Sequence, residues 1–340
     1  MTANSHHREG GGFRNPWPGA HPHGLSGVLK WTMSRRPAPA PAHRQQMSLS
    51  PEPLARHALS DEQTAHVPGS AANALAVTWI GHSTFLIQCN GLNILTDPIW
   101  SRRSSPVSFA GPERLMPPGV PFDSLPEIHA AFISHDHYDH LDDATVRRLI
   151  DRFPRIQWFV PLGVVAFLHR RGAANVAELD WWNELSIGPI SAQCTPAQHF
   201  SGRFPWDRDS TLWCGWVIRV GDFRVFFAGD TALHTEFRRI AGRYGPFDVA
   251  ILPIGAYEPR WFMRPVHMDP VESVTAYQQL TADTPGHDCV MIASHWGTFR
   301  LTDEPLDEPP VLAREAWTNS GLNEQLLAIL AHGQCLVVER

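Results

Sequence analysis

The sequence predicts an α/β fold in which apolar strands alternate with amphipathic helices and deliver polar side chains to one edge. The chain has 340 residues, 43% of them hydrophobic, and can therefore bury a large core. Short apolar runs such as residues 130–133 and 224–227 have the length of buried strands. Residues 134–142, with three histidines and three aspartates, directly follow the first of these runs.

The first expected elements are three strands, at residues 76–80, 84–89 and 92–96. Asn90-Gly91 lies between the last two. This dipeptide is a strong hairpin signal, because it tolerates the positive φ angles that a tight two-residue turn requires.

Residues 135–140 pack three imidazoles and a carboxylate into the spacing H-x-H-x-D-H. Histidine is the commonest metal ligand, and the end of a strand is a rigid place from which to project ligands. His135 and His137 can face one cation, and Asp139 and His140 a second. The alternative is a polar surface loop, which has no need of three histidines at this spacing.

Helices and strands alternate after this motif. Asp142 or Asp143 can cap a helix whose apolar face carries Val146, Leu149 and Ile150. The later elements are expected at 157–162 (strand), 163–171 (helix), 186–231 (mostly strands), 235–244 (helix), 249–254 (strand), 270–280 (helix), 322–330 (helix) and 334–338 (strand).

Three further polar residues, His199, Asp230 and His295, each follow an apolar, strand-like segment. Their separations, counted onward from His140, are 59, 31 and 65 residues. Together with the motif at 135–140, this pattern resembles the metallo-β-lactamase superfamily. The resemblance implies a four-layered αβ/βα sandwich with all seven ligands on one sheet edge.

Within that superfamily the chain resembles the N-acyl-phosphatidylethanolamine-hydrolysing phospholipase D family. The stretches that carry this resemblance are residues 15–18 (NPWP), 79–84 (WIGHST), 95–98 (LTDP), 245–248 (GPFD), 253–263 (PIGAYEPRWFM), 267–270 (HMDP) and 295–299 (HWGTF). The resemblance covers nearly the whole chain from about residue 75. Residues 201–214, and most of residues 1–75, depart from the family pattern, which bears on acyl-chain specificity more than on chemistry.

The resemblance implies a two-metal site. The first metal would be held by His135, His137, His199 and Asp230, and the second by Asp139, His140, Asp230 and His295. Such a set suits two Zn²⁺ ions per chain, with iron or manganese as alternatives. Cations sharing Asp230 would lower the pKa of a shared water and supply a hydroxide nucleophile. His82 and Asp97, at strand ends, could orient the ligands, the alternative being a structural, hydrogen-bonded His82.

Asp139 could also orient the hydroxide, and His267 could transfer a proton or hold a phosphate, unless it is a loop histidine without a role. The candidates for substrate contact are Tyr257, Arg260, Trp261 and Phe262. Their aromatic rings would offer apolar surface to acyl chains, while Arg260 could pair with Glu258 or with a phosphate. The alternative is a packed loop whose aromatic residues belong to the core.

We therefore expect a di-zinc phosphodiesterase that hydrolyses N-acyl-phosphatidylethanolamine-like phospholipids to phosphatidic acid and N-acylethanolamine. One alternative is a metal-dependent hydrolase of a soluble phosphodiester, lactone or thioester. Another is a metal-bound sensor or scaffold without enzymatic activity. An apolar channel beside the metals would distinguish the lipid substrate from the soluble ones.

Charge and composition exclude several other functions. Residues 1–58 carry seven basic and two acidic side chains, which leaves 21 basic and 32 acidic in the rest, near +5 and −11. An acidic body opposes nucleic-acid binding. Lys30, the only lysine, lacks the glycine-rich run of a P-loop, and no serine lies in a G-x-S-x-G elbow. The five cysteines form no C-x-x-C pair and are expected to be buried thiols in a reducing compartment.

Two regions are expected. Residues 1–70 form a basic, proline-rich arm, partly disordered, with a stiff spacer at 37–41 and a docked segment at 13–18. Residues 71–340 form the hydrolase domain. The chain shows no signal-peptide pattern and no run of 18 apolar residues, so we expect a cytoplasmic protein. Peripheral membrane contact and a homodimer are further expectations.

Overall fold

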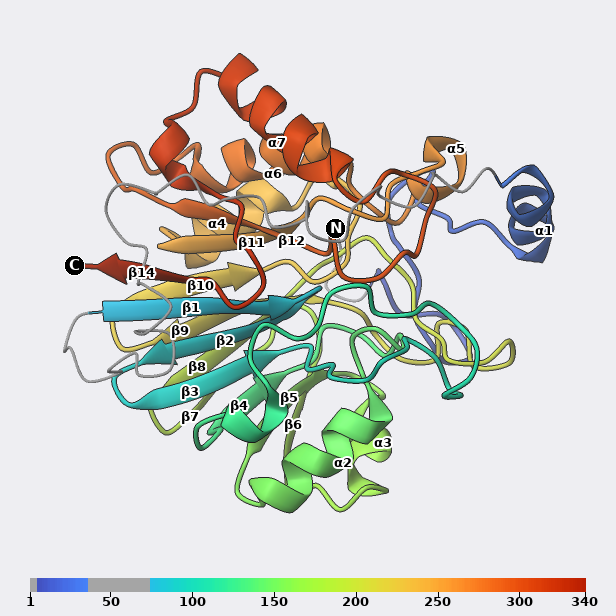
Figure 1. Cartoon of the computed structure of the whole chain (residues 1–340), viewed down its shortest axis with the longest axis horizontal. Helices are drawn as coiled ribbons and strands as arrows, with labels where there is room; N and C mark the ends of the chain where they lie inside the picture. Colours follow the sequence, from blue (N-terminus) through green and yellow to red (C-terminus); the bar gives the residue numbers. More distant parts are fainter. Residues whose placement is uncertain (1–4, 36–73) are drawn as a thin grey trace.

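Two seven-stranded mixed sheets lie face to face in the computed structural model, which describes residues 5–35 and 74–340. Helices cover the outer face of each sheet (Figure 1). The predicted four-layered αβ/βα sandwich is therefore confirmed.

The first sheet has the order β14-β1-β2-β3-β4-β5-β6. Its strands are β1 (Ala74–Gly81), β2 (Thr84–Cys89), β3 (Leu92–Thr96), β4 (Ala130–Phe132), β5 (Gln157–Pro161), β6 (Asn175–Leu179) and β14 (Cys335–Glu339). Pairing is antiparallel from β14 to β3 and parallel from β3 to β6.

The second sheet, in the order β13-β12-β11-β10-β9-β8-β7, repeats this division. Its strands are β7 (Glu184–Ile187), β8 (Ile190–Thr195), β9 (Gly215–Val220), β10 (Phe223–Phe227), β11 (Val249–Pro253), β12 (Val290–Ser294) and β13 (Leu327–Ala328). Pairing is antiparallel from β7 to β10 and parallel from β10 to β13.

The strand directions bring the polar side chains together. β1 and β3 are both antiparallel to β2, so they run the same way, and β4 is parallel to β3. In the second sheet β8 and β10 run the same way for the same reason, and β11 and β12 are parallel to β10. The carboxyl ends of these strands all emerge on the right in Figure 1. Ligands of open α/β sheets bind outside such ends.

Alternation along β4 assigns its side chains to two cores. Ala130 and Phe132 face the second sheet, where the ring centroid of Phe132 lies 5.4 Å from that of Trp216. Ala131 and Ile133 face the outer helices. This period of two, with all four residues fully buried, explains why the strand reads as a continuous apolar run.

The helices lie where their apolar faces are covered. The short 3-10 helix η2 spans Phe122–Ser124, and the α-helices are α1 (Leu25–Ser34), α2 (Asp143–Arg152), α3 (Val165–His169), α4 (Phe237–Tyr244), α5 (Arg260–Met263), α6 (Pro270–Thr281) and α7 (Glu308–Asn319). α2 and α3 cover the first sheet, while α4, α6 and α7 cover the second (Figure 1). Asp142 caps α2 by accepting from the Thr145 main-chain N–H, a contact worth about 1 kcal/mol.

Two expected elements differ from the structure. The helix predicted at 322–330 is wrong: only Glu324–Leu326 forms a 3-10 turn, η3, and Leu327–Ala328 is strand β13. Parallel pairing with Met291 and Ile292 of β12 outweighs the helical propensity of this leucine-rich segment. The real helix nearby, α7, carries two prolines in its first turn, where they are tolerated. Within 186–231, residues 196–214 form no strand.

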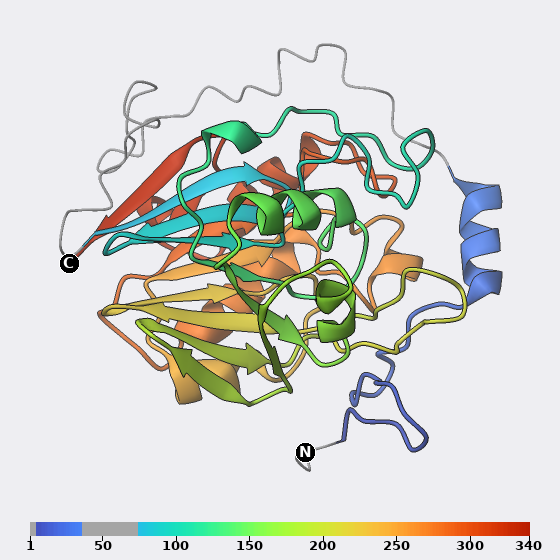
Figure 2. The same cartoon turned by 90° about the horizontal axis from the view of Figure 1, so that it is seen from below.

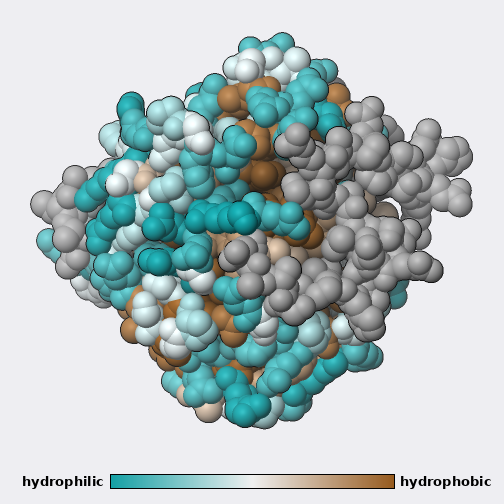
Figure 3. Space-filling view, turned by 90° about the vertical axis from the view of Figure 1, so that its left-hand side faces the viewer, coloured by the Kyte–Doolittle hydropathy of each residue, from teal (hydrophilic) through white to brown (hydrophobic). Residues whose placement is uncertain are grey.

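In Figure 2 the described segment that leads to α1 lies at the periphery of the domain, with α1 set apart from the sheets. Phe13 and Trp17 are buried, so the predicted docking of 13–18 is confirmed. The spacer at 37–41 falls outside the described residues. The face at the opposite end of the strands is mainly hydrophilic, with hydrophobic residues showing between (Figure 3). Over the described ranges, no helix combines the length and apolar character needed to cross a membrane.

Candidate metal centre

The seven predicted ligands gather around one carboxylate oxygen, Oδ2 of Asp230. On one side, His135 Nε2 lies 4.0 Å and His199 Nε2 3.8 Å from this oxygen. On the other side, His140 Nε2 lies 3.2 Å and His295 Nε2 3.0 Å from it. Asp230 therefore stands between two groups of imidazoles, as a residue shared by two cations must.

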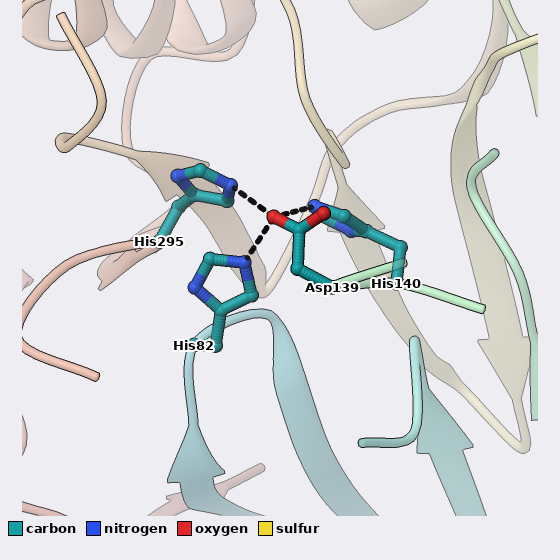
Figure 4. A group of neighbouring side chains, drawn as sticks. All are labelled: His82, Asp139, His140 and His295. Atoms are coloured by element: carbon teal, nitrogen blue, oxygen red, sulfur yellow. Dashed lines mark hydrogen bonds and ion pairs between the residues drawn. The ribbon is translucent and has the colours of Figure 1, made fainter. Parts of the chain in front are cut away.

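The remaining two candidates complete these groups. His137 Nδ1 lies 2.8 Å from His135 Nε2 and 3.2 Å from His199 Nε2. Asp139 Oδ2 lies 3.4 Å from His140 Nε2 and 3.6 Å from His295 Nε2, and Figure 4 shows the imidazoles converging on it. The two groups match the two ligand sets expected from the sequence.

The distances fit shared cations better than direct bonding. Ligand atoms about 2.0–2.1 Å from one tetrahedral Zn²⁺ lie ~3.3 Å apart. The separations within the second group, 3.0–3.6 Å, surround that value. His140 Nε2, His295 Nε2 and Asp230 Oδ1 are buried and have no hydrogen-bond partner among the described residues. Buried polar atoms aimed at a common point call for a cation, so the residues fit the metals that the fold implies.

A third cluster, at the N-terminus, has different geometry. The Nε2 atoms of His6 and His7 lie 2.6 and 2.8 Å from the two carboxylate oxygens of Asp180. Each imidazole is thus within hydrogen-bond distance of its own carboxylate oxygen, and the three groups satisfy one another without a cation. The cluster therefore reads as a hydrogen-bonded attachment of the arm.

Hydrogen bonds fix which ring nitrogen of each histidine is free. His140 Nδ1 donates to Asp97 Oδ2 (2.6 Å), and His199 Nδ1 donates to the Val266 carbonyl (2.9 Å). Ser134 donates its hydroxyl hydrogen to Asp97 and so accepts from His135 Nδ1 (2.9 Å). In all three imidazoles the Nε2 lone pair is left for a metal, and the expected orienting role of Asp97 is seen in its contacts.

His82, also expected near the site, donates from Nε2 to Asp139 Oδ2 at 2.9 Å (Figure 4). It adopts a positive φ of 57°, as do Asp97 (33°) and His295 (61°), a conformation that costs energy in residues other than glycine. Such conformations are concentrated at functional sites. Gly229, at φ +60°, leads into Asp230, and a Cβ there would meet the Ser134 side chain at 2.5 Å. Only glycine lets the two ligand loops approach this closely.

Burial and charge divide the imidazoles into two classes. Burial lowers the pKa of His137 to about 4 and of His199 to about 3, so these rings are neutral. Burial also opposes charge on His295, but Asp230 and Asp139 outweigh it and raise its pKa to about 9. They raise the pKa of His140 well above its usual value in the same way. A cation entering between these carboxylates would replace protons.

The predicted catalytic His267 joins the centre. Its Nδ1 lies 4.0 Å from Asp230 Oδ2 and has no hydrogen-bond partner among the described residues. Burial lowers the pKa of His267 well below its usual value, so the ring is neutral. Its main-chain carbonyl accepts from Arg260 Nη1 at 3.1 Å.

The four substrate candidates lie away from the metal ligands. The Arg260 guanidinium pairs with Glu272 (2.6 Å), whereas the Glu258 carboxylate accepts from the Arg260 main-chain N–H (2.9 Å). The expected Arg260–Glu258 side-chain pair is absent, because Glu272 is already fixed there by the capping box of α6. Tyr257 is buried and donates to Glu308 at 2.6 Å. The other candidates contact α1: Phe262 stacks on Trp31 (5.2 Å), and Lys30 lies 4.6 Å from the centroid of the Trp261 ring.

The sequence reasoning missed a cavity of about 730 Å³ beside the motif loop. Tyr138 and Asp142, both from 134–142, line it together with five arginines, at 102, 103, 170, 171 and 203. Arg203 donates to the main-chain carbonyls of Asp136 (2.8 Å) and Leu141 (2.7 Å) and so holds the motif loop. Tyr138, inside the motif, was the sequence signal available for this cavity. The arginines come from segments that are far apart in the sequence and are brought together only by folding.

Exposed aromatic rings lie beside this cavity. Phe204, in its lining, is 45% exposed and stacks in parallel on Trp206, which is 81% exposed, at 4.9 Å. Two exposed rings stacked on each other form a small apolar surface at the edge of the cavity. The combination of a cationic cavity and an apolar rim suits an anionic amphiphile.

Comparisons with known proteins agree with this geometry. The model of the beta-lactamase superfamily domain matches residues 92–296. An uncharacterized protein of Mycobacterium tuberculosis is 42% identical over 76% of this chain and 70% of its own. N-acyl-phosphatidylethanolamine-hydrolyzing phospholipase D 1 of Caenorhabditis elegans is 40% identical over 70% and 68%. The solved isothiocyanate hydrolase from Delia radicum gut bacteria superposes with a TM-score of 0.59 at 19% identity, covering 78% of this chain and 99% of its own, a likeness of fold.

Proposed function

The chain belongs to the β-lactamase superfamily of metal-dependent hydrolases, and we propose that it hydrolyses N-acyl-phosphatidylethanolamine-like phospholipids to phosphatidic acid and N-acylethanolamine. The observation that carries the proposal is the pair of ligand groups meeting at Asp230 Oδ2 in a chain 40% identical to a phospholipase D of this specificity. The reaction class is hydrolysis of a phosphodiester.

In this proposal His135, His137, His199 and Asp230 hold one zinc ion. Asp139, His140, Asp230 and His295 hold the other. Two such cations, when bound, activate water and offset negative charge on the phosphoryl oxygens.

The chain's own groups position the reactants. Asp139, held at Oδ2 by His82, can orient the attacking water through its other oxygen. The neutral imidazole of His267 can accept a proton or donate one hydrogen bond to a phosphate oxygen, since its Nδ1 is free of protein partners among the described residues. Arg260 acts on His267 by holding its carbonyl, and so need not touch the phosphate itself.

Charge beside the site favours a phosphate-bearing substrate over a lactone or thioester. The lining of the cavity next to the motif contains five arginines against three aspartates, in a chain of net charge −6. The exposed Arg170 side chain makes no hydrogen bond or ion pair within the described residues, and the guanidinium geometry suits phosphate oxygens. A lactone offers no negative charge for this set to bind.

Peripheral contact with a membrane is part of the proposal. α1 exposes Leu29 (62%) and Met33 (81%) beside the basic Lys30 and Arg35. Apolar side chains flanked by cations bind anionic lipid surfaces. Replacing Leu29 and Met33 together with serine should reduce co-sedimentation with vesicles containing phosphatidylserine; unchanged binding at low and high salt would argue against this role of α1.

The test of the function is turnover by the zinc-loaded protein. N-acyl-phosphatidylethanolamine should be cleaved with release of N-acylethanolamine, and much faster than a panel of a soluble phosphodiester, a lactone and a thioester. Faster turnover of the lactone or thioester would contradict the proposal that the protein is a phosphodiesterase. Comparable rates on a soluble phosphodiester would support phosphodiester hydrolysis but contradict the proposed preference for a lipid substrate.

A further inference from the structure

Residues 5–20 precede the segment matched by the superfamily model, yet they are tied to the domain at several points. His6 and His7 contact Asp180, as described above, and Arg8 pairs with Asp209 at 2.6 Å. The Phe13 main-chain N–H donates to the Asp209 carbonyl at 2.8 Å. These contacts hold Asn15 and Trp17, which follow in the chain, close to the segments that carry the predicted ligands.

Asn15 is the residue that reaches a predicted ligand. Its buried Nδ2 donates to the main-chain carbonyl of His199 at 2.7 Å and to that of Ala20 at 2.8 Å. Its Oδ1 accepts from Trp213 Nε1 at 3.2 Å, and the same indole N–H donates to the Ala197 carbonyl at 2.9 Å. One hydrogen of the amide therefore holds the His199 main chain, the other holds Asn15's own segment at Ala20, and the oxygen holds the Trp213 indole, which also binds the Ala197 carbonyl.

Trp17, two residues on, supports the neighbouring loop. Its indole stacks on the imidazole of His234, with ring centroids 4.8 Å apart, and lies 5.7 Å from the Trp181 ring. His234 follows Asp230 by four residues and is buried. The N-terminal segment thus contacts the segments of two predicted ligands, His199 and Asp230.

On the basis of the two-metal centre proposed above, we propose that Asn15 is a positioning residue for that centre. It holds the His199 main chain so that Nε2 points at the first metal. The His199 ring is fixed at its other end by the Nδ1 bond to Val266. Without Asn15, a buried carbonyl loses its donor, and the backbone that sets the ring position is free to move.

The experiment compares Asn15→Ala and Asn15→Ser with Asn93→Ala in the full-length, zinc-loaded protein. Asn93 is the control because its Nδ2 also donates to a main-chain carbonyl, that of Glu127 at 2.7 Å, in a more exposed bond away from the ligands. Zinc release to a chromogenic chelator, melting temperature, and kcat and KM are measured for each. The serine variant keeps a polar group and serves where the alanine variant fails to fold.

We expect both Asn15 variants to release one of the two zinc ions about ten-fold faster or more, with a lowered kcat and little change in KM. Asn93→Ala should release zinc at the wild-type rate. The inference is overturned if the Asn15 variants lose only melting temperature and release zinc like the control. A wild-type protein that binds no metal would instead overturn the proposed function, so the two failures are distinguishable.

Discussion

Asp97→Asn tests whether the hydrogen bonds behind the ligands control metal binding. Asp97 is fully buried, and its carboxylate accepts three hydrogen bonds: from the Ser134 main-chain N–H (2.7 Å), the Ser134 hydroxyl (2.6 Å) and His140 Nδ1 (2.6 Å). In the variant, the amide oxygen can keep the main-chain bond, while the NH₂ group replaces Oδ2. That NH₂ can only donate, so His140 Nδ1 must become an acceptor and the ring proton moves to Nε2.

The proton on Nε2 then occupies the direction that a metal needs. Loss of such an orienting partner typically costs 10–100-fold in metal affinity, or about 1.4–2.7 kcal/mol. Since the amide nearly matches the carboxylate in size, the fold should persist, with a stability loss of about 1–3 kcal/mol from the altered bonds. The expected result is therefore loss of the metal held by His140 and His295. Because Oδ2 also accepts from the Ser134 hydroxyl, which orients His135, binding of the first metal should weaken as well.

Asp248→Asn is the matched control. Asp248 is also buried and accepts from the Arg224 main-chain N–H (2.8 Å) and from Arg340 (2.6 Å), at the opposite end of the strands. Metal content by elemental analysis, chelator titration and calorimetric unfolding are compared for the two variants. If Asp97→Asn binds two metals as tightly as Asp248→Asn does, the reasoning from tautomers is wrong.

Three further predictions concern other parts of the molecule. The purified protein should hold close to two zinc ions, and Asp230→Ala should lose metal and activity; a variant that keeps both metals and the full rate, by elemental analysis and assay, contradicts the shared ligand. Burial opposes charge on Asp180, but hydrogen bonds from His6 and His7 lower its pKa below the usual value. The contribution of Asp180 to stability should therefore be complete above the unfolded-state pKa of about 3.9 and be lost as pH falls through the folded-state pKa. The melting temperature of Asp180→Asn should fall less steeply with acidification than that of the wild-type protein. Phe262→Ala should reduce turnover of a long-chain substrate more than that of a soluble phosphodiester, in protein that still binds two metals; equal losses with a lowered melting temperature would assign Phe262 to packing.

The clustering of the candidate ligands was predictable from the sequence because these residues are close in sequence or follow strand ends. Four of the seven candidate ligands lie within residues 135–140, where spacing alone sets their proximity. His199, Asp230 and His295 each follow a strand that runs in the same direction, so the topology brings them to the same edge. The placement of Asp97 at the end of β3 likewise anticipated its contact with His140.

Side-chain contacts between segments that are far apart in the sequence could not be predicted in this way. Asn15 and His199 are separated by 184 residues, and no periodic pattern connects an N-terminal amide to that carbonyl. Arg260 has an adjacent carboxylate in sequence, Glu258, yet its guanidinium pairs with Glu272, which the capping box of α6 had already placed. The helix prediction for residues 322–330 was wrong for a related reason, because pairing with the neighbouring strand β12 determines the conformation of this segment.

Net charge and local charge bear on different classes of partner. The acidic body argues against a polyanion, because a nucleic acid samples charge over a large surface. A single phosphate interacts only with nearby charges, because charges in 0.15 M salt are screened beyond about 8 Å. In the lining of the cavity, arginines from three separate segments outnumber aspartates. An acidic protein can thus present a locally cationic site to a phosphate ester, and this local excess, rather than the overall charge, should govern how its KM responds to salt.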